Sequence, residues 1–293
     1  MTAGAAPRNL LGVHAGLWVA DWSPESARFA IAGSAAAGFD LIEIPVVNPR
    51  TTDLQHTSSV LAEHSLTSVV SLALDRHSDI NTEDPELSAR GERRLMDAVR
   101  FARDTGSTYI GGVVYGAMMK YDHAGSPAAR ENSLTVLRRV ADAAAASGIT
   151  LGMEYVHRYE SNLLNTAAQT VQFIQDLGAP NVVLHIDTFH VNMEEVSQAA
   201  AVRDAGPLLG YIHAAENHRG ELGRGSIDWL GLFAELHHAG YSGPSRSSPS
   251  HVPSWPARPP MTSACGASCG TTRRSWPARR ARSCAPAWPK RPP

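Results

Sequence analysis

The 293-residue sequence contains no apolar run long enough to cross a bilayer, and its first 243 residues contain no cysteine. The first absence excludes a helical membrane protein, because a transmembrane helix needs about 20 predominantly apolar residues. The second excludes a fold held by disulfides in this part of the chain. Residues 1–8 also lack the apolar segment of a secretory signal peptide. We therefore expect a cytoplasmic protein without a membrane partner.

Acidic side chains are missing from the end of the sequence. Residues 244–293 hold 9 Lys and Arg and no Asp or Glu, whereas residues 1–243 hold 17 Lys and Arg and 28 Asp and Glu, a net charge of −11. The same last segment holds 11 of the 19 prolines and all 3 cysteines, without a helical or alternating apolar pattern. Because such a composition does not support a packed core, we divide the chain into a folded body, 1–243, and an irregular Pro/Arg-rich tail, 244–293.

Short β-branched segments alternate with longer amphipathic segments throughout the body. The expected strands are 10–14, 41–45, 67–73, 109–114, 150–155, 182–187 and 209–213. The expected helices are 24–37, 54–64, 85–105, 127–147, 166–177, 194–201 and 228–239. Seven successive strand–helix units predict an α/β fold with parallel strands joined by right-handed crossovers.

An open doubly wound sheet and a closed barrel both fit this alternation. A doubly wound sheet usually carries a Gly-x-Gly-x-x-Gly turn after its first strand, and here that turn reads His14-Ala15-Gly16-Leu17-Trp18. We therefore predict a TIM-type (β/α)8 barrel. Its eighth strand should begin just past Gly240, where the composition changes, so the aberrant tail takes the place of the eighth strand–helix unit.

Three polar residues end successive predicted strands. They are Glu154, Asp187 and His213. In a parallel barrel the carboxyl ends of the strands share one rim, where catalytic groups gather. Two carboxylates and an imidazole are ligands suited to Mn2+, Mg2+, Co2+ or Zn2+. One such residue alone would fit a helix cap or an ion pair, but three on successive strands predict a metal site.

A second set of polar residues follows these strand ends in the expected loops. Glu160, His190 and Arg219 come six, three and six residues after the three strand-end residues. They could face a substrate bound at the rim. Taken singly, Arg219 also fits a solvated surface charge and His190 a packing residue. His185, in the middle of its strand, is interpreted as a packing residue.

Three sequence segments together resemble the ketose 3-epimerases, which include the D-tagatose, D-psicose (D-allulose) and L-ribulose 3-epimerases of the sugar-phosphate isomerase/epimerase-like barrels. The segments are 154–166 (EYVHRYESNLLNT), 185–190 (HIDTFH) and 213–219 (HAAENHR), and the resemblance extends over residues 10–243. One departure is His157, where the family usually has Asn. A bulkier, titratable ring beside Glu154 could alter metal affinity or pH dependence.

The resemblance implies a metal-dependent isomerase that inverts C3 of free ketoses, converting D-fructose to D-psicose or D-tagatose to D-sorbose. It implies that Glu154, Asp187 and His213 bind the cation, with Mn2+ favoured and Co2+ or Mg2+ possible. It further implies that Glu160, His190 and Arg219 hold the sugar hydroxyls. In the family chemistry one glutamate removes the C3 proton to give an enediolate and another returns a proton to the opposite face, and Glu154 would be one of this pair. Family members form homodimers or homotetramers, which we expect here.

The second glutamate of the family belongs to strand eight, at the position of Ser248. No acidic residue follows position 243. Residues 245–250, Ser-Arg-Ser-Ser-Pro-Ser, can be encoded by codons that, shifted by one base, read Val-Thr-Phe-Glu-Ser-Phe, an alternating strand with Glu at that position. We hypothesise a one-base deletion near codon 244 and an out-of-frame tail. The expected consequences are an unclosed sheet with exposed edges on its first and seventh strands, a weakened metal site and impaired turnover.

Other functions fit parts of the same pattern. An aldose–ketose isomerase or a hydroxypyruvate isomerase-like enzyme could use the same barrel, although the 154–160 and 213–219 spacings favour an epimerase. A metal-dependent endonuclease fits less well, because nucleic-acid binding requires a basic surface and the body carries a net charge of −11. We therefore expect no nucleic-acid partner. The missing strand-eight glutamate also allows a catalytically inactive sugar-binding protein.

Overall fold

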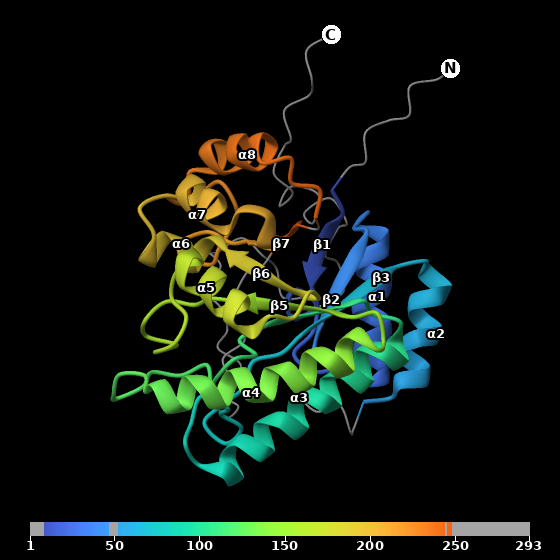
Figure 1. The fold of residues 1–293 in the computed structure, drawn as a ribbon. Coiled ribbons are helices and arrows are strands. Elements are labelled where there is room, and N and C mark those ends of the chain that lie inside the picture. Colours follow the sequence, from blue (N-terminus) through green and yellow to red (C-terminus); the bar gives the residue numbers. More distant parts are fainter. Residues whose placement is uncertain (1–8, 47–51, 244, 248–293) are drawn as a thin grey trace, which may run out of the picture.

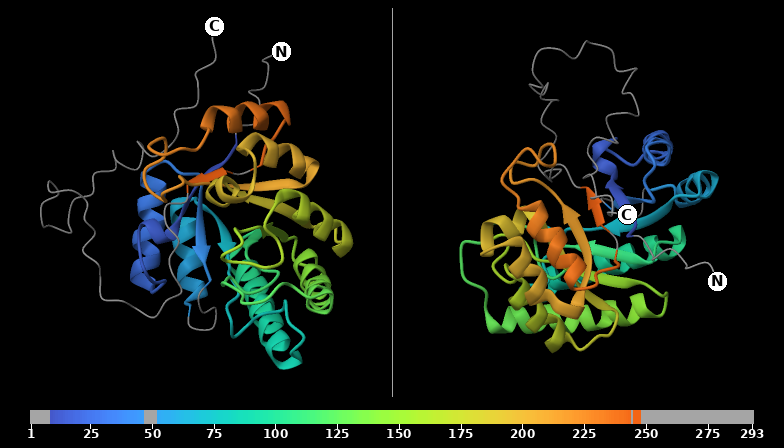
Figure 2. Two further views of the ribbon diagram at one scale, coloured as in Figure 1. Left: turned by 90° about the vertical axis from the view of Figure 1, so that its left-hand side faces the viewer. Right: turned by 90° about the horizontal axis from the view of Figure 1, so that it is seen from above.

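The computed structural model describes residues 9–46, 52–243 and 245–247. Its parallel strands close into a barrel in chain order, and the longer helices lie around the outside of the sheet (Figure 1 and Figure 2). The prediction of a TIM-type barrel is confirmed.

The elements alternate along the chain as the sequence indicates. The strands are β1 (Leu11–His14), β2 (Leu41–Pro45), β3 (Thr67–Ser71), β4 (Tyr109–Gly112), β5 (Thr150–Glu154), β6 (Val182–Asp187), β7 (Leu209–Ala214) and β8 (Ser245–Ser247). The helices are α1 (Pro24–Ala36), α2 (Leu54–His64), α3 (Pro85–Thr105), α4 (Pro127–Ala145), α5 (Ala167–Leu177), α6 (Thr188–Glu194), α7 (Gln198–Ala205) and α8 (Trp229–His238), with short 3-10 helices η1 (Ala15–Leu17) and η2 (Gly206–Leu208).

The segment after β6 differs from the expectation. One helix over residues 194–201 was expected, and the structure has α6 and α7 instead. The Asp187 carboxylate accepts a hydrogen bond from the Phe189 N–H and starts α6 directly after the strand. Ser197 caps α7 through Ala200 N–H. The polar residue at the strand end is thus also a helix N-cap, which begins the helix earlier than apolar periodicity suggests.

The expectation of an unclosed sheet is wrong. β8 pairs in parallel with β1 from Leu11↔Ser245 to Val13↔Ser247, and with β7 from Ile212↔Ser245 to Ala214↔Ser247. Ladder hydrogen bonds join backbone groups, so a three-residue segment closes the barrel whatever side chains it carries. The position of Ser248 lies outside the described residues, as does the rest of the tail, and the division into body and tail stays a prediction.

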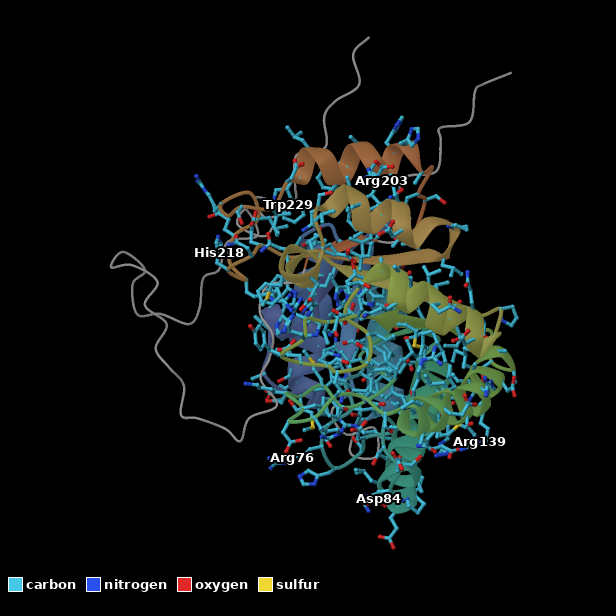
Figure 3. All side chains as sticks on the ribbon, turned by 60° about the vertical axis from the view of Figure 1, so that its left-hand side comes forward. Arg76, Asp84, Arg139, Arg203, His218 and Trp229 are labelled. Atoms are coloured by element: carbon cyan, nitrogen blue, oxygen red, sulfur yellow. The ribbon has the colours of Figure 1, made fainter. Side chains whose placement is uncertain are left out.

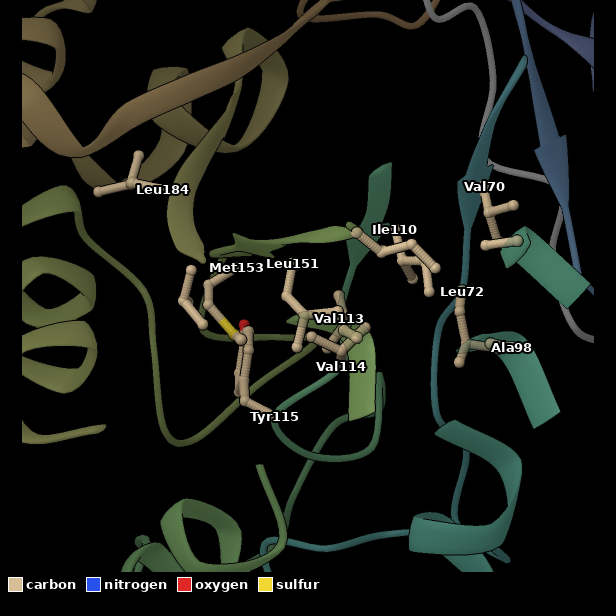
Figure 4. Packing of buried hydrophobic residues seen from close by; sticks show 14 of the residues in the cluster. Val70, Leu72, Ala98, Ile110, Val113, Val114, Tyr115, Leu151, Met153 and Leu184 are labelled. Carbon is tan, nitrogen blue, oxygen red and sulfur yellow. The ribbon is translucent and has the colours of Figure 1, made fainter. Parts of the chain in front are cut away.

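The apolar core lies between the barrel and the helices. Val70, Ile110 and Leu151 occupy matching register positions on three neighbouring strands and belong to the same buried cluster as Ala98 of α3 (Figure 4). Full burial of one such aliphatic side chain contributes about 1.5–3 kcal/mol to stability. This layer fixes the strands, and through them the positions of the residues at the strand ends.

The inside of the barrel holds polar and aromatic side chains. Tyr109 of β4 stacks on Tyr211 of β7 with ring centroids 4.5 Å apart. These strands are not neighbours in the sheet, so the contact crosses the barrel interior. Gly152 makes room for it, because a Cβ built at this position would lie 1.7 Å from the Tyr109 hydroxyl. The interior directly below the carboxyl-terminal rim is therefore lined by groups that can form hydrogen bonds.

Charged side chains extend from the outer helices (Figure 3). Arg139 of α4 binds Glu92 of α3 through two hydrogen bonds of 2.7 Å, and Arg203 of α7 pairs with Glu235 of α8. Each exposed pair stabilises the fold by at most about 1 kcal/mol. Of the helices in the described part of the chain, none combines the length and the apolar character needed to cross a membrane.

Candidate active site

The three predicted strand-end residues meet at the carboxyl-terminal rim. Asp187 and His213 are register partners on β6 and β7, and Glu154 ends β5. All three are buried, with exposed fractions of 9% for Glu154, 2% for Asp187 and 3% for His213. His213 Nδ1 lies 3.3 Å from Glu154 Oε1 and 3.8 Å from Asp187 Oδ2. The structure therefore brings together the side chains that the sequence analysis selected.

Three sets of side chains in the described ranges bring possible ligand atoms within 4.8 Å of one another. They are Glu154, His185 and His213; Glu154, Asp187 and His190; and His157, Glu160 and His190. The expected set of Glu154, Asp187 and His213 is not one of the three, although His213 Nδ1 lies within 4 Å of an oxygen from each carboxylate. Glu154 belongs to two sets. Nitrogen and carboxylate oxygen donors of this kind suit a divalent transition metal.

Arg219 supplies a fixed positive charge at the rim. Its Nη1 donates to Asp187 Oδ2 at 2.7 Å, and its Nη2 lies 3.2 Å from His190 Nε2. The guanidinium stacks on the Phe189 ring at 3.9 Å from the centroid. Burial alone would raise the pKa of Asp187, but the charges of Arg219, His190 and His213, with the hydrogen bond from Arg219, together outweigh burial and hold that pKa well below its ordinary value. These contacts do not fit the alternative interpretation, in which Arg219 is a solvated surface charge.

Glu160 and the imidazoles next to it form the outer part of the site. Glu160 Oε2 lies 3.5 Å from His157 Nε2 and 3.9 Å from His190 Nδ1. Burial raises the pKa of Glu160 to about 7, with Arg219 opposing and Glu154 reinforcing the shift. Near neutral pH this carboxyl group is therefore present in both forms and can either donate or accept a hydrogen bond. The backbone N–H of His157 also donates to His190 Nδ1 at 3.3 Å.

The protonation of Glu154 is set by the surrounding imidazoles. Burial on its own would raise the pKa of Glu154, but His213 and His185 lower it below the ordinary value for a glutamate. His185 is buried, and its ring is perpendicular to that of His213 with centroids 3.8 Å apart. His185 was expected to be a packing residue, and it also places a ring nitrogen within 4.8 Å of possible ligand atoms of Glu154 and His213. Glu154 is thereby kept ionised near neutral pH, as a proton acceptor must be.

Sequence reasoning missed Glu43 on β2. Its side chain is 1% exposed, and its Oε2 lies 3.1 Å from His213 Nε2 and accepts from the Tyr211 hydroxyl at 3.3 Å. The only signal in the sequence is a glutamate within an apolar strand, Leu41–Pro45. Catalytic groups are expected at strand ends, whereas Glu43 lies inside its strand.

Known proteins with a similar sequence and fold carry related names. Residues 31–251 match the family described as "Xylose isomerase-like TIM barrel". An L-ribulose 3-epimerase of Methylomonas sp. (strain DH-1) is 41% identical over 241 residues, 82% of this chain and 84% of that protein. A ketose 3-epimerase of Arthrobacter globiformis is 39% identical over 234 residues, 80% of this chain and 81% of that protein.

Solved structures give the same assignment. A D-allulose 3-epimerase from Methylomonas sp. in complex with D-allulose superposes with a TM-score of 0.81 and 39% identity over 83% of this chain and 85% of that chain. A structure of L-ribulose 3-epimerase gives a TM-score of 0.80 and 35% identity over 83% of this chain and 82% of that chain. The chain belongs to the xylose isomerase-like TIM-barrel family and, within it, to the ketose 3-epimerases, which are isomerases of carbohydrates.

Proposed function

We propose that this protein epimerises free ketoses at C3, interconverting pairs such as D-fructose and D-psicose (D-allulose), or D-tagatose and D-sorbose. The observation that carries the proposal is the buried contact of His213 Nδ1 with both Glu154 and Asp187, together with the guanidinium of Arg219, which pairs with the same Asp187 oxygen. The relatives named as ketose 3-epimerases support the same reaction.

The donor set suits a divalent cation, with Glu154, Asp187 and His213 as the residues that would hold it. Two carboxylates and one imidazole suit several divalent cations, and the resemblance to the family favours Mn2+ among them, with Co2+ or Mg2+ as alternatives. When bound, such a cation makes the C3 proton of a ketose more acidic by withdrawing electron density from the neighbouring carbonyl. The carboxylates are buried, and the charge of Arg219 already favours the ionised form of Asp187.

Glu154 removes the C3 proton in this proposal. Its lowered pKa keeps it ionised at neutral pH, and its place at the end of β5 directs it to the rim. Glu160, His190 and Arg219 bind the sugar hydroxyls, because they present both hydrogen-bond donors and acceptors beside Glu154 and Asp187. Glu160 has a pKa of about 7, so its carboxyl group can donate a hydrogen bond to a sugar hydroxyl or accept one from it.

Return of the proton to the opposite face needs a second acid. The family pattern assigns this role to a strand-eight glutamate, and no Asp or Glu follows residue 243 of this sequence. We infer that turnover by the chain as written is impaired for this reason. The frame hypothesis is tested separately by sequencing the encoding DNA, and codons that are intact and in frame in independent copies of the gene would contradict it.

The activity test compares two proteins. One is the chain as written, and the other is encoded by the same gene with one base restored before codon 244. Each is incubated with D-fructose or D-psicose in added Mn2+ or in excess chelator, and the products are separated by chromatography. We expect chelator-sensitive C3 epimerisation by the restored protein and little or none by the chain as written. A Glu154→Gln variant of the restored protein is the control for a contaminating epimerase.

The outcomes separate the proposals. Formation of an aldose would show that the protein is an aldose–ketose isomerase on the same barrel and not an epimerase. Equal turnover by both proteins would contradict the need for a strand-eight glutamate. Absence of turnover of D-fructose and of D-psicose by both proteins would contradict the proposed epimerisation and favour an inactive sugar-binding protein. Sedimentation of the same samples tests the accompanying proposal of a homodimer or homotetramer.

A further inference from the structure

Glu43 is a buried carboxylate to which the proposed reaction assigns no role. It lies in the middle of β2 between Ile42 and Ile44, which are fully buried in the apolar core. An ionisable side chain at 1% exposure is costly unless it is paired or hydrogen-bonded. The contacts of Glu43 therefore indicate what it does.

Two contacts of Glu43 involve the same carboxylate oxygen and two residues of one strand, β7. Oε2 lies 3.1 Å from His213 Nε2, and the Tyr211 hydroxyl donates to the same oxygen at 3.3 Å. Both partners come from β7, which is not adjacent to β2 in the barrel. The contact therefore crosses the interior of the barrel.

The two nitrogens of His213 face different groups. Nδ1 lies close to Glu154 Oε1 and Asp187 Oδ2, at 3.3 Å and 3.8 Å, whereas Nε2 lies close to Glu43. Ring nitrogens of an imidazole point away from each other, so Glu43 lies on the side of the ring opposite the two rim carboxylates. It is therefore placed to act on His213, and not to share an ion bound at Nδ1.

We propose that Glu43 is a positioning residue that acts through His213. Its carboxylate accepts the Nε2–H of His213, which leaves Nδ1 as the ligand atom, fixes the ring orientation and increases the basicity of the ring. Tyr211 orients the carboxylate by donating to the same oxygen. This inference rests on the proposed function, because it requires that His213 binds the cation.

The test uses the full-length chain as written, the frame-restored protein and four variants of the full-length chain. Glu43→Leu removes the acceptor, Glu43→Gln keeps an acceptor oxygen but removes the charge, and Tyr211→Phe removes the orienting hydroxyl. The control is Asp79→Asn, since Asp79 is also a buried carboxylate and accepts from Tyr121 and two backbone N–H groups, on a different part of the barrel. Circular dichroism and thermal unfolding first establish that each variant is folded without metal.

Two measurements are then made on each folded protein. Competition with a chelator gives the dissociation constant for Co2+, and the visible spectrum reports the geometry of the bound ion. Nuclear magnetic resonance of the metal-free protein, with 15N-labelled histidine, reports whether the Nε2–H of His213 is protected from exchange with water. The second measurement does not depend on metal binding or on activity.

The inference predicts a specific order of effects. Glu43→Leu weakens Co2+ binding by about 10- to 100-fold, the usual cost of losing a residue that orients a metal ligand. Glu43→Gln and Tyr211→Phe weaken it less, because an acceptor oxygen remains. In the metal-free protein the His213 Nε2–H is protected in the wild type and exposed to exchange in Glu43→Leu. Asp79→Asn lowers the unfolding temperature and changes neither measurement.

Other results would overturn it. Equal Co2+ affinity in wild type and Glu43→Leu would refute the role of Glu43 while leaving the metal-dependent function in place. A His213 Nε2–H that exchanges as fast in the wild type as in Glu43→Leu would refute the hydrogen bond itself. Absence of Co2+ binding by every protein, including the frame-restored one, would refute the proposed metal site and this inference with it.

Discussion

Arg219 and Asp187 form a hydrogen-bonded ion pair of 2.7 Å at the rim of the barrel, and the same Asp187 oxygen faces His213. The carboxylate of Glu154 also lies near His213 Nδ1, so two buried carboxylates meet at this imidazole. The guanidinium of Arg219 lowers the pKa of Asp187 and so favours its ionised form. The backbone of Arg219 has a φ of 56°, a left-handed conformation that is strained for a residue with a side chain. The orientation of this guanidinium is therefore maintained by its contacts.

Replacing Phe189 by Leu should loosen Arg219 without removing it. The ring lies 3.9 Å from the guanidinium carbon, and a cation–π contact contributes about 0.5–2 kcal/mol. In the frame-restored protein we expect KM for D-psicose to rise by about 2- to 30-fold, with kcat less affected. The control is Phe173→Leu, because Phe173 lies under Arg130 on the outer helices at 5.3 Å. Phe173→Leu should lower the unfolding temperature and leave KM unchanged, and an equal rise in both variants would contradict the role of Phe189.

Glu160 should make the metal-free protein less stable as the pH rises from about 4.5 to 7. Burial raises the pKa of Glu160 to about 7, so the folded state keeps a proton that the unfolded state loses near the ordinary glutamate pKa of 4.5. The contribution of Glu160 to the free energy of unfolding is therefore complete below its pKa in the unfolded state. It is lost as the pH rises through its pKa in the folded state. Glu160→Gln should be more stable than wild type at pH 8, by up to about 3 kcal/mol, and similar to it at pH 4.

Thermal unfolding across this pH range measures the effect. The matched control is Glu92→Gln, because the hydrogen bond from Arg139 lowers the pKa of Glu92 and the pH dependence should have the opposite sign. This exposed pair contributes at most about 1 kcal/mol, so its effect should be smaller. If Glu160→Gln and wild type differed in stability by the same amount at pH 4 and at pH 8, the assignment of a raised pKa to Glu160 would be wrong.

The order of strands and helices could be predicted because each unit carries its own local signals. Apolar periodicity marks the elements, and residues such as Asp84, which accepts hydrogen bonds from two N–H groups of α3, mark where helices begin. The rim residues Glu154, Asp187 and His213 could be found because strand ends converge in a parallel barrel. These features depend on short sequence segments and on one general property of the fold.

The features that the sequence did not reveal depend on contacts between distant segments. Glu43 meets His213 across 170 positions of sequence, and nothing in β2 indicates this partner. Closure by β8 was missed because hydrophobic patterns predict strands that bury side chains, whereas Ser245–Ser247 is placed by backbone pairing with strands on both sides. The split into α6 and α7 was missed because Asp187 was interpreted as a metal ligand in preference to a helix cap, whereas it also caps α6.

Gly152→Ala should destabilise the barrel from the inside. A Cβ at this position would lie 1.7 Å from the Tyr109 hydroxyl oxygen and 2.4 Å from the adjacent ring carbon, so the Tyr109–Tyr211 stack must move. Overpacking of this kind costs about 1–3 kcal/mol. The double variant Gly152→Ala with Tyr109→Phe removes the closest contact and should recover part of the loss. Urea unfolding of the two single variants and the double variant measures the coupling, and strict additivity would contradict the clash.

Ending the chain after Gly243 should open the barrel. The truncation removes β8, whose backbone pairs with Leu11, Gly12 and Val13 on one side and with Ile212, His213 and Ala214 on the other. Two unpaired edges promote association between molecules, and each lost hydrogen bond costs about 0.5–1.5 kcal/mol. We expect a lower unfolding temperature and concentration-dependent aggregation by light scattering. The comparison is a chain ending after Ser250, which keeps β8, so similar behaviour of the two truncated chains would show that pairing by Ser245–Ser247 does not stabilise the barrel.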